Sequence, residues 1–197
     1  LLAISDIFRS GKLPKFVNHT FITLIPKNDR PSEIAHYRPI SCCNVYYKIF
    51  AKVLCNRLKH FLPYLISENQ SAFVYGRYIG ENILLAHELL RDFKKKGMPK
   101  MCVKVDLQKA YDCVNREFIC YIMSKMKFPT HFINIIYECM STATFSIMIQ
   151  GVPKGFITSN RGIRQGDPLS PYLFTIAMQF FSYMMDEVTQ QKIFQPS

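Results

Sequence analysis

Two stretches, MCVKVDLQKAYD at residues 101–112 and RGIRQGDPLSP at residues 161–171, decide how this sequence is interpreted. In the first, apolar and polar side chains alternate from Met101 to Asp106, which predicts a β-strand with one buried face. Asp106 ends that strand on its polar face, where a carboxylate can reach a metal ion without burying an unpaired charge. A single aspartate is weak evidence for a metal site, because most such residues occupy solvated turns or caps.

The remaining sequence predicts many helices and few strands, which is an α+β pattern. Asn44 suits the N-cap of a long helix that runs to about Leu62, with apolar residues every three to four positions. A lysine run at residues 94–96 would end a helix over residues 78–96, where cations are favourable. Further helices are expected at 115–127, 130–140 and from 171 onward, capped by Asn115, Thr130 and Ser170, and strands at 20–25, 144–149 and 156–158.

Composition favours a globular chain with a polyanionic partner. The 197 residues carry a formal net charge of +11, and 49% are hydrophobic, so we expect one domain or two small lobes that share a core. No stretch reaches the ~18 apolar residues of a membrane helix, and the nearest, Leu173 to Met185, contains Gln179. Because the charge is spread through the sequence, nucleic acid is favoured over a membrane surface.

The seven cysteines do not form a metal-binding pattern. None lies in a CxxC or CxxxC spacing, and no cluster of cysteine and histidine suggests zinc. We therefore expect free, buried thiols in a reducing compartment, and no zinc.

An ordered series of motifs along the whole chain resembles the reverse transcriptases of non-LTR retrotransposons, the long interspersed element type. VKVDLQKAYD and RGIRQGDPLSP are its most specific members, and the segments upstream agree in sequence and in order. Those upstream segments are GKLP (11–14), LIPK (24–27), YRPISCCNVYYKIFAKVLCNRL (37–58), LISENQSAFVYGR (65–77) and ENILLAHEL (81–89).

The resemblance implies a right-hand polymerase fold, of which this chain holds the fingers and part of the palm. We expect a helix-rich α+β structure with a short antiparallel sheet and no thumb. Residues 1–100 would be mainly fingers, 101–115 the palm strand with the metal-binding aspartate, 116–155 a return to the fingers, and 156–197 palm.

The resemblance also implies a two-metal site for nucleotidyl transfer. Asp106 matches the first metal-binding aspartate of the palm, where it would bridge two Mg²⁺ ions, and the carbonyl of Leu107 would be a further ligand. Tyr111 matches the aromatic residue under the incoming sugar, which excludes a 2′-hydroxyl and so favours deoxynucleotides. Asp112 is expected only to organise the turn into the next helix.

Two cations and one loop match the substrate-binding residues of the family. Lys27 and Arg38 would hold the triphosphate, a task that suits the planar fork of arginine. Gln165 and Gly166 would line the nucleotide and template pocket, where a glycine lets the backbone approach the substrate.

Three further arginines are candidates for nucleic-acid contacts. Arg77 matches a template contact. Arg161 and Arg164 would lie near the backbone of bound nucleic acid. The alternative interpretation is that they are only solvated charges there. The expected partners are an RNA template, a DNA primer and deoxynucleoside triphosphates, with no membrane, and the resemblance implies an intracellular, nuclear location.

The sequence departs from the family at its second metal motif. That motif is an aromatic residue, one further residue and two consecutive aspartates, and this chain contains no Asp-Asp pair. We therefore expect a fragment of an RNA-directed DNA polymerase that is inactive by itself. The alternatives are a polymerase-derived module that binds nucleic acid without catalysis, and a remnant without function.

Overall fold

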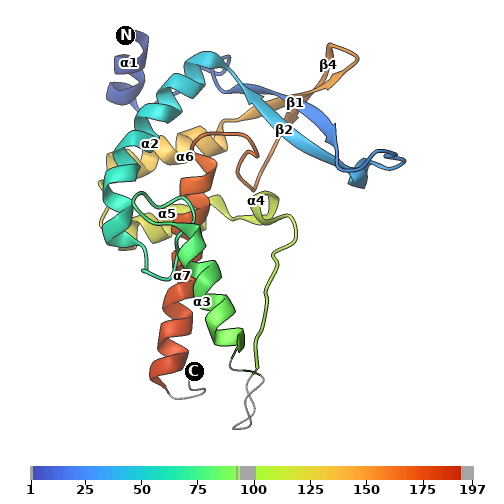
Figure 1. Cartoon of the computed structure of the whole chain (residues 1–197). Coiled ribbons are helices and arrows are strands. Elements are labelled where there is room, and N and C mark those ends of the chain that lie inside the picture. The colour runs from blue at the N-terminus through green and yellow to red at the C-terminus, as the bar shows by residue number, and fades with distance from the viewer. Residues whose placement is uncertain (1, 92, 94–100, 192–197) are drawn as a thin grey trace.

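The computed structural model of the protein describes residues 2–91, 93 and 101–191, and combines one sheet with a set of helices beside it (Figure 1). In the figure, the strands extend to one side of the molecule, while α2, α5, α6 and the first half of α7 gather on the other. The elements in chain order are α1 (Leu2–Ser10), β1 (His19–Pro26), the 3-10 helix η1 (Ile34–His36), β2 (Tyr37–Cys43), α2 (Val45–Leu65), α3 (Ile79–Arg91), α4 (Ala110–Cys113), α5 (Arg116–Lys125), α6 (Thr130–Ser141), β3 (Thr144–Ile149), β4 (Val152–Thr158) and α7 (Ser170–Gln190).

The four strands form one mixed sheet in the order β2-β1-β3-β4. β1 pairs with β2, and β3 with β4, in antiparallel hairpins, which agrees with the predicted antiparallel sheet. The third pair differs, because β1 and β3 run parallel, with His19 opposite Thr144 and Ile22 opposite Ile147. A parallel pair needs a long crossover connection, so this contact joins residues 19–22 to a hairpin more than a hundred residues away.

Helix α2 supplies the centre of the core. Tyr47, Phe50, Leu54 and Leu58 recur at three to four residues and are fully buried. Burying a side chain of this size contributes roughly 2 kcal/mol relative to leaving it exposed. The predicted cap is confirmed, because the Asn44 side chain accepts a hydrogen bond from the Tyr46 N–H at 2.9 Å.

Helices α1, α5, α6 and α7 also add buried residues to this core. The predicted cap of α5 is confirmed, because the Asn115 side chain accepts a hydrogen bond from the Phe118 N–H at 3.0 Å. The other two caps are wrong by one residue or more. Thr130 is already helical, and Ser170 is the first residue of α7, whose start is held instead by Asp167.

The predicted strand from Met101 to Asp106 is wrong. Residues 101–107 belong to no sheet, and their side chains are exposed, with Val105 at 64%. An alternating sequence becomes a strand only beside a partner, and within the described part of the chain none lies next to it. In Figure 1 it runs alone towards α4.

Helix α3 buries no residue, and the second half of α7 is similarly open. Leu84 on α3 is 69% exposed, and Phe181 on α7 is 48% exposed. None of the helices in residues 2–91 and 101–191 is long and apolar enough to cross a membrane. The predicted end of α3, at the lysine run of residues 94–96, lies outside the described residues.

The seven cysteines are free, as expected, but only some are buried. Cys43, Cys55 and Cys139 lie in the interior, whereas Cys42, Cys102 and Cys113 are exposed and Cys120 is half-buried. Burial raises the pKa of Cys55 to about 12 and that of Cys120 to about 11, so these thiols stay protonated near neutral pH.

We predict that the open faces of α3 and α7 make the isolated chain associate. Its mass by gel filtration with light scattering should rise with concentration, because exposed contiguous apolar surface drives association. The double variant Leu84→Glu/Phe181→Glu should shift the protein towards monomer. Ile34→Glu is the matched control, because Ile34 is 84% exposed but lies on the isolated η1 turn. A monomeric wild-type peak at high concentration would contradict this.

Candidate functional site

The loop that joins β4 to α7, residues 159–169, is held in place by a buried arginine. Arg164 is only 7% exposed, and its Nε and Nη2 donate to Asp167 Oδ2 at 3.0 and 2.8 Å. Its Nη1 donates to Asn18 Oδ1 at 2.8 Å and to Thr20 Oγ1 at 3.1 Å. Its Nη2 also reaches the carbonyl of Cys139 at 3.3 Å, so one guanidinium joins the loop to β1 and α6.

Asp167 extends this network to two more helices. Tyr47 of α2 donates its hydroxyl to Asp167 Oδ2 at 2.6 Å, and the Leu169 N–H donates to Oδ1 at 2.9 Å. The Arg164 guanidinium stacks on the Tyr47 ring at 4.0 Å. Burial, and then the Asp167 carboxylate, raise the pKa of Tyr47 well above its usual value, so its hydroxyl keeps its proton.

The alternative that Arg164 is only a solvated charge is therefore wrong. Its place near the backbone of bound nucleic acid stays a prediction. Burial alone would lower the pKa of Arg164, but Tyr47 and Asp167 outweigh that effect and raise it. The charge is neutralised inside the protein. Sequence reasoning missed this because its partners Asn18 and Thr20 lie far away in the chain.

A second buried arginine, Arg116 at the start of α5, holds the first part of the loop. Its Nε donates to the Gly162 carbonyl at 2.8 Å, and its other nitrogens donate to the carbonyls of Ser159 and Arg161. Burial lowers the pKa of Arg116 from its usual value. Sequence reasoning missed this residue too, because an arginine in the first turn of a helix normally faces solvent.

The loop also contacts the α4 segment, so the two diagnostic motifs meet. The Gly162 N–H donates to the Val114 carbonyl at 2.8 Å, and the Ile163 N–H donates to the Tyr111 carbonyl at 2.9 Å. Gly162 has φ +81°, and a Cβ there would lie 2.7 Å from the Asp112 carbonyl oxygen. Only glycine fits between these backbones.

The far end of the loop docks on the free edge of β2. The Ser41 N–H donates to the Gln165 carbonyl at 2.8 Å. A Cβ on Gly166, which has φ +107°, would lie 2.9 Å from the Ser41 carbonyl oxygen and 3.4 Å from Ile40. A cavity of about 320 Å³ lies beneath the loop, and its lining includes Ser41, Asp112 and Gln165.

Tyr111, Gln165 and Gly166 are thus brought together by the loop, which also carries Arg161 and Arg164. The remaining predicted site residues, Asp106, Leu107, Lys27, Arg38 and Arg77, lie elsewhere. Tyr111 is half-buried and packs edge-on against Phe174 with ring centroids 5.3 Å apart. Asp106 and Leu107 are exposed on the separate segment before α4.

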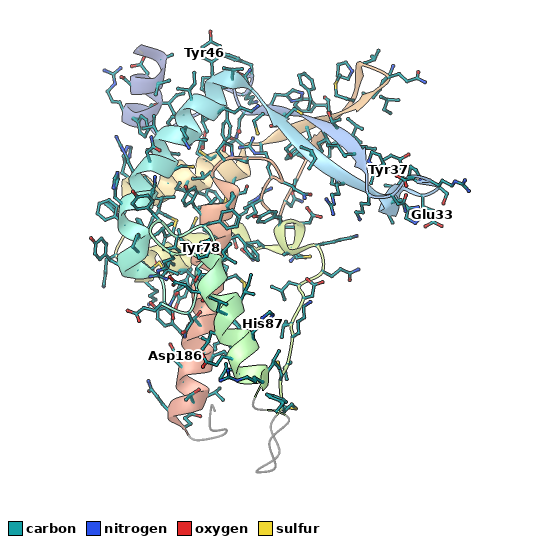
Figure 2. The ribbon with its side chains drawn as sticks, viewed as in Figure 1. Glu33, Tyr37, Tyr46, Tyr78, His87 and Asp186 are labelled. Atoms are coloured by element: carbon teal, nitrogen blue, oxygen red, sulfur yellow. The ribbon has the colours of Figure 1, made fainter. Side chains whose placement is uncertain are left out.

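Lys27 and Arg38 lie on the hairpin of β1 and β2. Lys27 Nζ donates to the Ala35 carbonyl at 2.8 Å. Arg38 is exposed, and strand alternation places it on the opposite face from Pro39 and Ser41, which line the cavity. Figure 2 shows Tyr37, the neighbour of Arg38, near the tip of this hairpin and away from the helices.

Arg77 has an intramolecular role that the sequence did not indicate. Its guanidinium donates to four backbone carbonyls at the end of α2 and in the turn that follows, so four of its five N–H donors are engaged within the protein. Those carbonyls belong to Pro63, Ile66, Ser67 and Gln70. Arg161, by contrast, is exposed.

Metal-ligating side chains do not cluster in the described residues. No group of three or more histidine, cysteine, aspartate or glutamate side chains there could hold an ion. Asp106 stands alone, and its carboxylate with the Leu107 carbonyl does not fit a complete two-ion site.

A comparison with known families identifies the chain. The family described as "Reverse transcriptase (RNA-dependent DNA polymerase)" matches residues 25–195. The protein therefore belongs to the reverse transcriptase family, which confirms the resemblance and the α+β fold of fingers and palm type.

Its relatives place it among the reverse transcriptases of non-LTR elements. It is 29% identical over 178 residues to the "Transposon TX1 uncharacterized 149 kDa protein" of Xenopus laevis, covering 90% of this chain and 14% of that protein. It is 28% identical over 173 residues to the "Retrovirus-related Pol polyprotein from type-1 retrotransposable element R2" of Nasonia vitripennis, covering 87% and 17%. The "Probable RNA-directed DNA polymerase from transposon BS" of Drosophila melanogaster is 24% identical over 182 residues, 89% of this chain and 20% of that protein. The chain thus spans a small part of each relative.

We predict that Asp167→Asn destabilises the protein by about 3–5 kcal/mol, because it leaves the Arg164 charge buried without a partner. Urea unfolding followed by circular dichroism would measure this. Asp6→Asn is the matched control, because it breaks an ion pair with Arg9 on the surface, where the effect should be below about 1 kcal/mol. Equal midpoints for the two variants would contradict the prediction.

We also predict that Gly162→Ala destabilises the protein more than Gly151→Ala. Both glycines have positive φ, +81° and +78°, so both variants carry backbone strain of about 1–3 kcal/mol. Only Gly162 adds a clash with the Asp112 backbone, since nothing lies within 4 Å of a Cβ at Gly151. Urea unfolding and hydrogen exchange at the Ile163 amide would measure the difference. Unchanged exchange at Ile163 in Gly162→Ala would count against it.

Proposed function

We propose that this chain forms the fingers and part of the palm of an RNA-directed DNA polymerase. Such an enzyme extends a DNA primer with deoxynucleoside triphosphates and copies an RNA template. Residues 1–100 are mainly fingers, 101–115 and 156–197 are palm, and 116–155 return to the fingers. The observation that carries the proposal is the junction of the RGIRQGDP loop with the Tyr111 turn, through backbone hydrogen bonds of 2.8 and 2.9 Å.

The junction supports a role in holding the nucleotide. It fixes Tyr111, Gln165 and Gly166 around one loop, where Tyr111 would exclude a 2′-hydroxyl and the glycine would let a base or sugar approach the backbone. Arg38 and Lys27 lie on the hairpin of β1 and β2. The cross-strand neighbour of Arg38 is Ile25, which carries no charge, and Lys27 donates to the uncharged Ala35 carbonyl. Because neither contact neutralises a charge, both cations are available to a triphosphate.

Divalent metal use follows from the family in general, and Mg²⁺ is our specific proposal. Asp106 with the Leu107 carbonyl would be one part of the metal centre. Magnesium bound by a polymerase takes carboxylates together with substrate phosphates, and one exposed aspartate supplies too little charge. We therefore propose that the chain alone does not catalyse nucleotidyl transfer, and that the activity belongs to the larger protein.

A second candidate function is nucleic-acid binding without catalysis. The net charge of +11, together with the lack of a carboxylate cluster in the described residues, favours this module. Binding and extension must therefore be measured separately.

We predict that the purified chain binds an RNA–DNA primer-template with a Kd below about 1 µM. The affinity should fall steeply as the salt concentration rises, because phosphate contacts release counterions. It should not extend the primer when Mg²⁺ and deoxynucleotides are added. Fluorescence anisotropy across a salt series and a gel-based extension assay would measure the two properties.

Asp106→Ala and its matched control Asp186→Ala, another exposed aspartate, should both bind as wild type does. Templated, Mg²⁺-dependent extension that Asp106→Ala abolishes would contradict the predicted inactivity. A lack of binding by monomeric protein would contradict the proposed function.

A further inference from the structure

A second cavity, whose lining is mostly polar, lies beside the loop, between the start of α5, the end of α6 and the turn at residues 159–161. Its volume is about 310 Å³, and its lining includes Arg116, Glu117, Tyr137, Ser141, Asn160 and Arg161. It is distinct from the cavity beneath the loop, although Arg116, Ser159 and Arg161 border both. Apart from Arg161, the catalytic motifs place no residue in it.

The charge of Arg116 is not neutralised inside the protein. Four of its N–H groups donate to the carbonyls of Gly162, Ser159 and Arg161 and to the Ser159 hydroxyl, all of which are uncharged. A guanidinium has five N–H groups, so one remains free of these bonds. Within the described chain, no carboxylate lies within ion-pair distance of Arg116, which is only 8% exposed. This contrasts with Arg164, whose charge Asp167 balances.

The other side chains of the cavity have donors to spare. The side chains of Arg161, Asn160 and Tyr137 make no hydrogen bond to any other described residue. The same holds for Ser141, at the last turn of α6. Glu117, the one carboxylate of the lining, is exposed in the first turn of α5. Two arginines against one glutamate leave the cavity positive, and the donors come from three separate elements.

We propose that this cavity binds a phosphate group of a nucleic-acid backbone. A phosphate oxygen can accept from the remaining N–H of Arg116, while Arg161 and the Tyr137 hydroxyl donate to the other oxygens, and charge-assisted bonds of this kind are strong. The choice of a backbone phosphate rests on the proposed function. The phosphate-binding chemistry itself rests only on the uncompensated charge of Arg116 and the free donors around it.

The position of the cavity gives such a contact a consequence for the polymerase site. The carbonyls that Arg116 holds belong to the turn that leads into Gly162, and Gly162 contacts the Asp112 backbone. A phosphate bound here would therefore be only a few residues from the loop that fixes Tyr111 and Gln165. Phosphate contacts of this kind set the register of a nucleic acid without reading its sequence.

The first test titrates inorganic phosphate into the ¹⁵N-labelled chain at constant ionic strength. We expect saturable shifts of the Asn160 and Arg161 amide resonances. Arg161→Gln should weaken phosphate binding about tenfold, because it removes a charge-assisted bond, and Tyr137→Phe about threefold, because it removes one neutral donor. Arg9→Gln, which removes an exposed arginine on α1, should change nothing. Absent shifts, or shifts that all variants share, would overturn the proposal.

The second test separates a backbone phosphate from a free one. With a primer-template, Arg161→Gln should reduce the slope of log K against log salt by about one, and Arg9→Gln should leave it unchanged. Primer-template should also displace inorganic phosphate from the cavity. An unchanged slope in Arg161→Gln, or binding of phosphate that primer-template does not displace, would overturn the assignment to a nucleic-acid backbone. If the chain binds phosphate but not the primer-template, the proposed function and the assignment to a nucleic-acid backbone are both overturned. The binding of an anion in the cavity would still stand.

Discussion

The ion pair between Arg164 and Asp167 is the interaction on which the rest of the structure depends. Moving either charge out of water costs several kcal/mol, so the pair is stable only because every neighbouring donor and acceptor is engaged. Those neighbours come from β1, α2 and α6, which are distant in sequence. The ion pair therefore fixes the loop before α7 in one position, and that position decides where the two diagnostic motifs meet.

Around this anchor, the candidate site is built mainly from backbone contacts. Gly162 and Gly166 lie against the carbonyls of Asp112 and Ser41, so close backbone contacts hold the loop between α4 and the edge of β2. The buried side chains of Arg164 and Arg116 hold it from within. Under the proposed function, charges would be needed in addition, and the candidates Asp106, Lys27 and Arg38 lie on separate elements.

Local signals in the sequence predicted much of the fold. The caps Asn44 and Asn115 and the apolar spacing in α2 depend on neighbouring residues only, and they were correct. The strand at Met101–Asp106 was wrong because alternation specifies a face but cannot supply a partner. The intramolecular bonds of Arg164, Arg116 and Arg77 were not predicted, for the same reason: the groups that accept from them are brought near only by folding. The motif series, in contrast, identified the family and its site loop, because it reflects ancestry and does not depend on knowing the contacts.

Helix α3 is attached to the rest of the protein mainly near its start, where Arg77 and Asn82 make hydrogen bonds. The arginine gathers the carbonyls at the end of α2, and just after it Asn82, in the first turns of α3, donates to the Asn69 carbonyl and accepts from the Ser71 hydroxyl. Beyond that point the residues of α3 are exposed, so among the described residues the hydrogen bonds that hold this helix to the preceding turn lie at its start. Leu84 and Leu89 lie further along and are exposed. Any force applied to them would therefore reach the core through the two hydrogen bonds of Asn82.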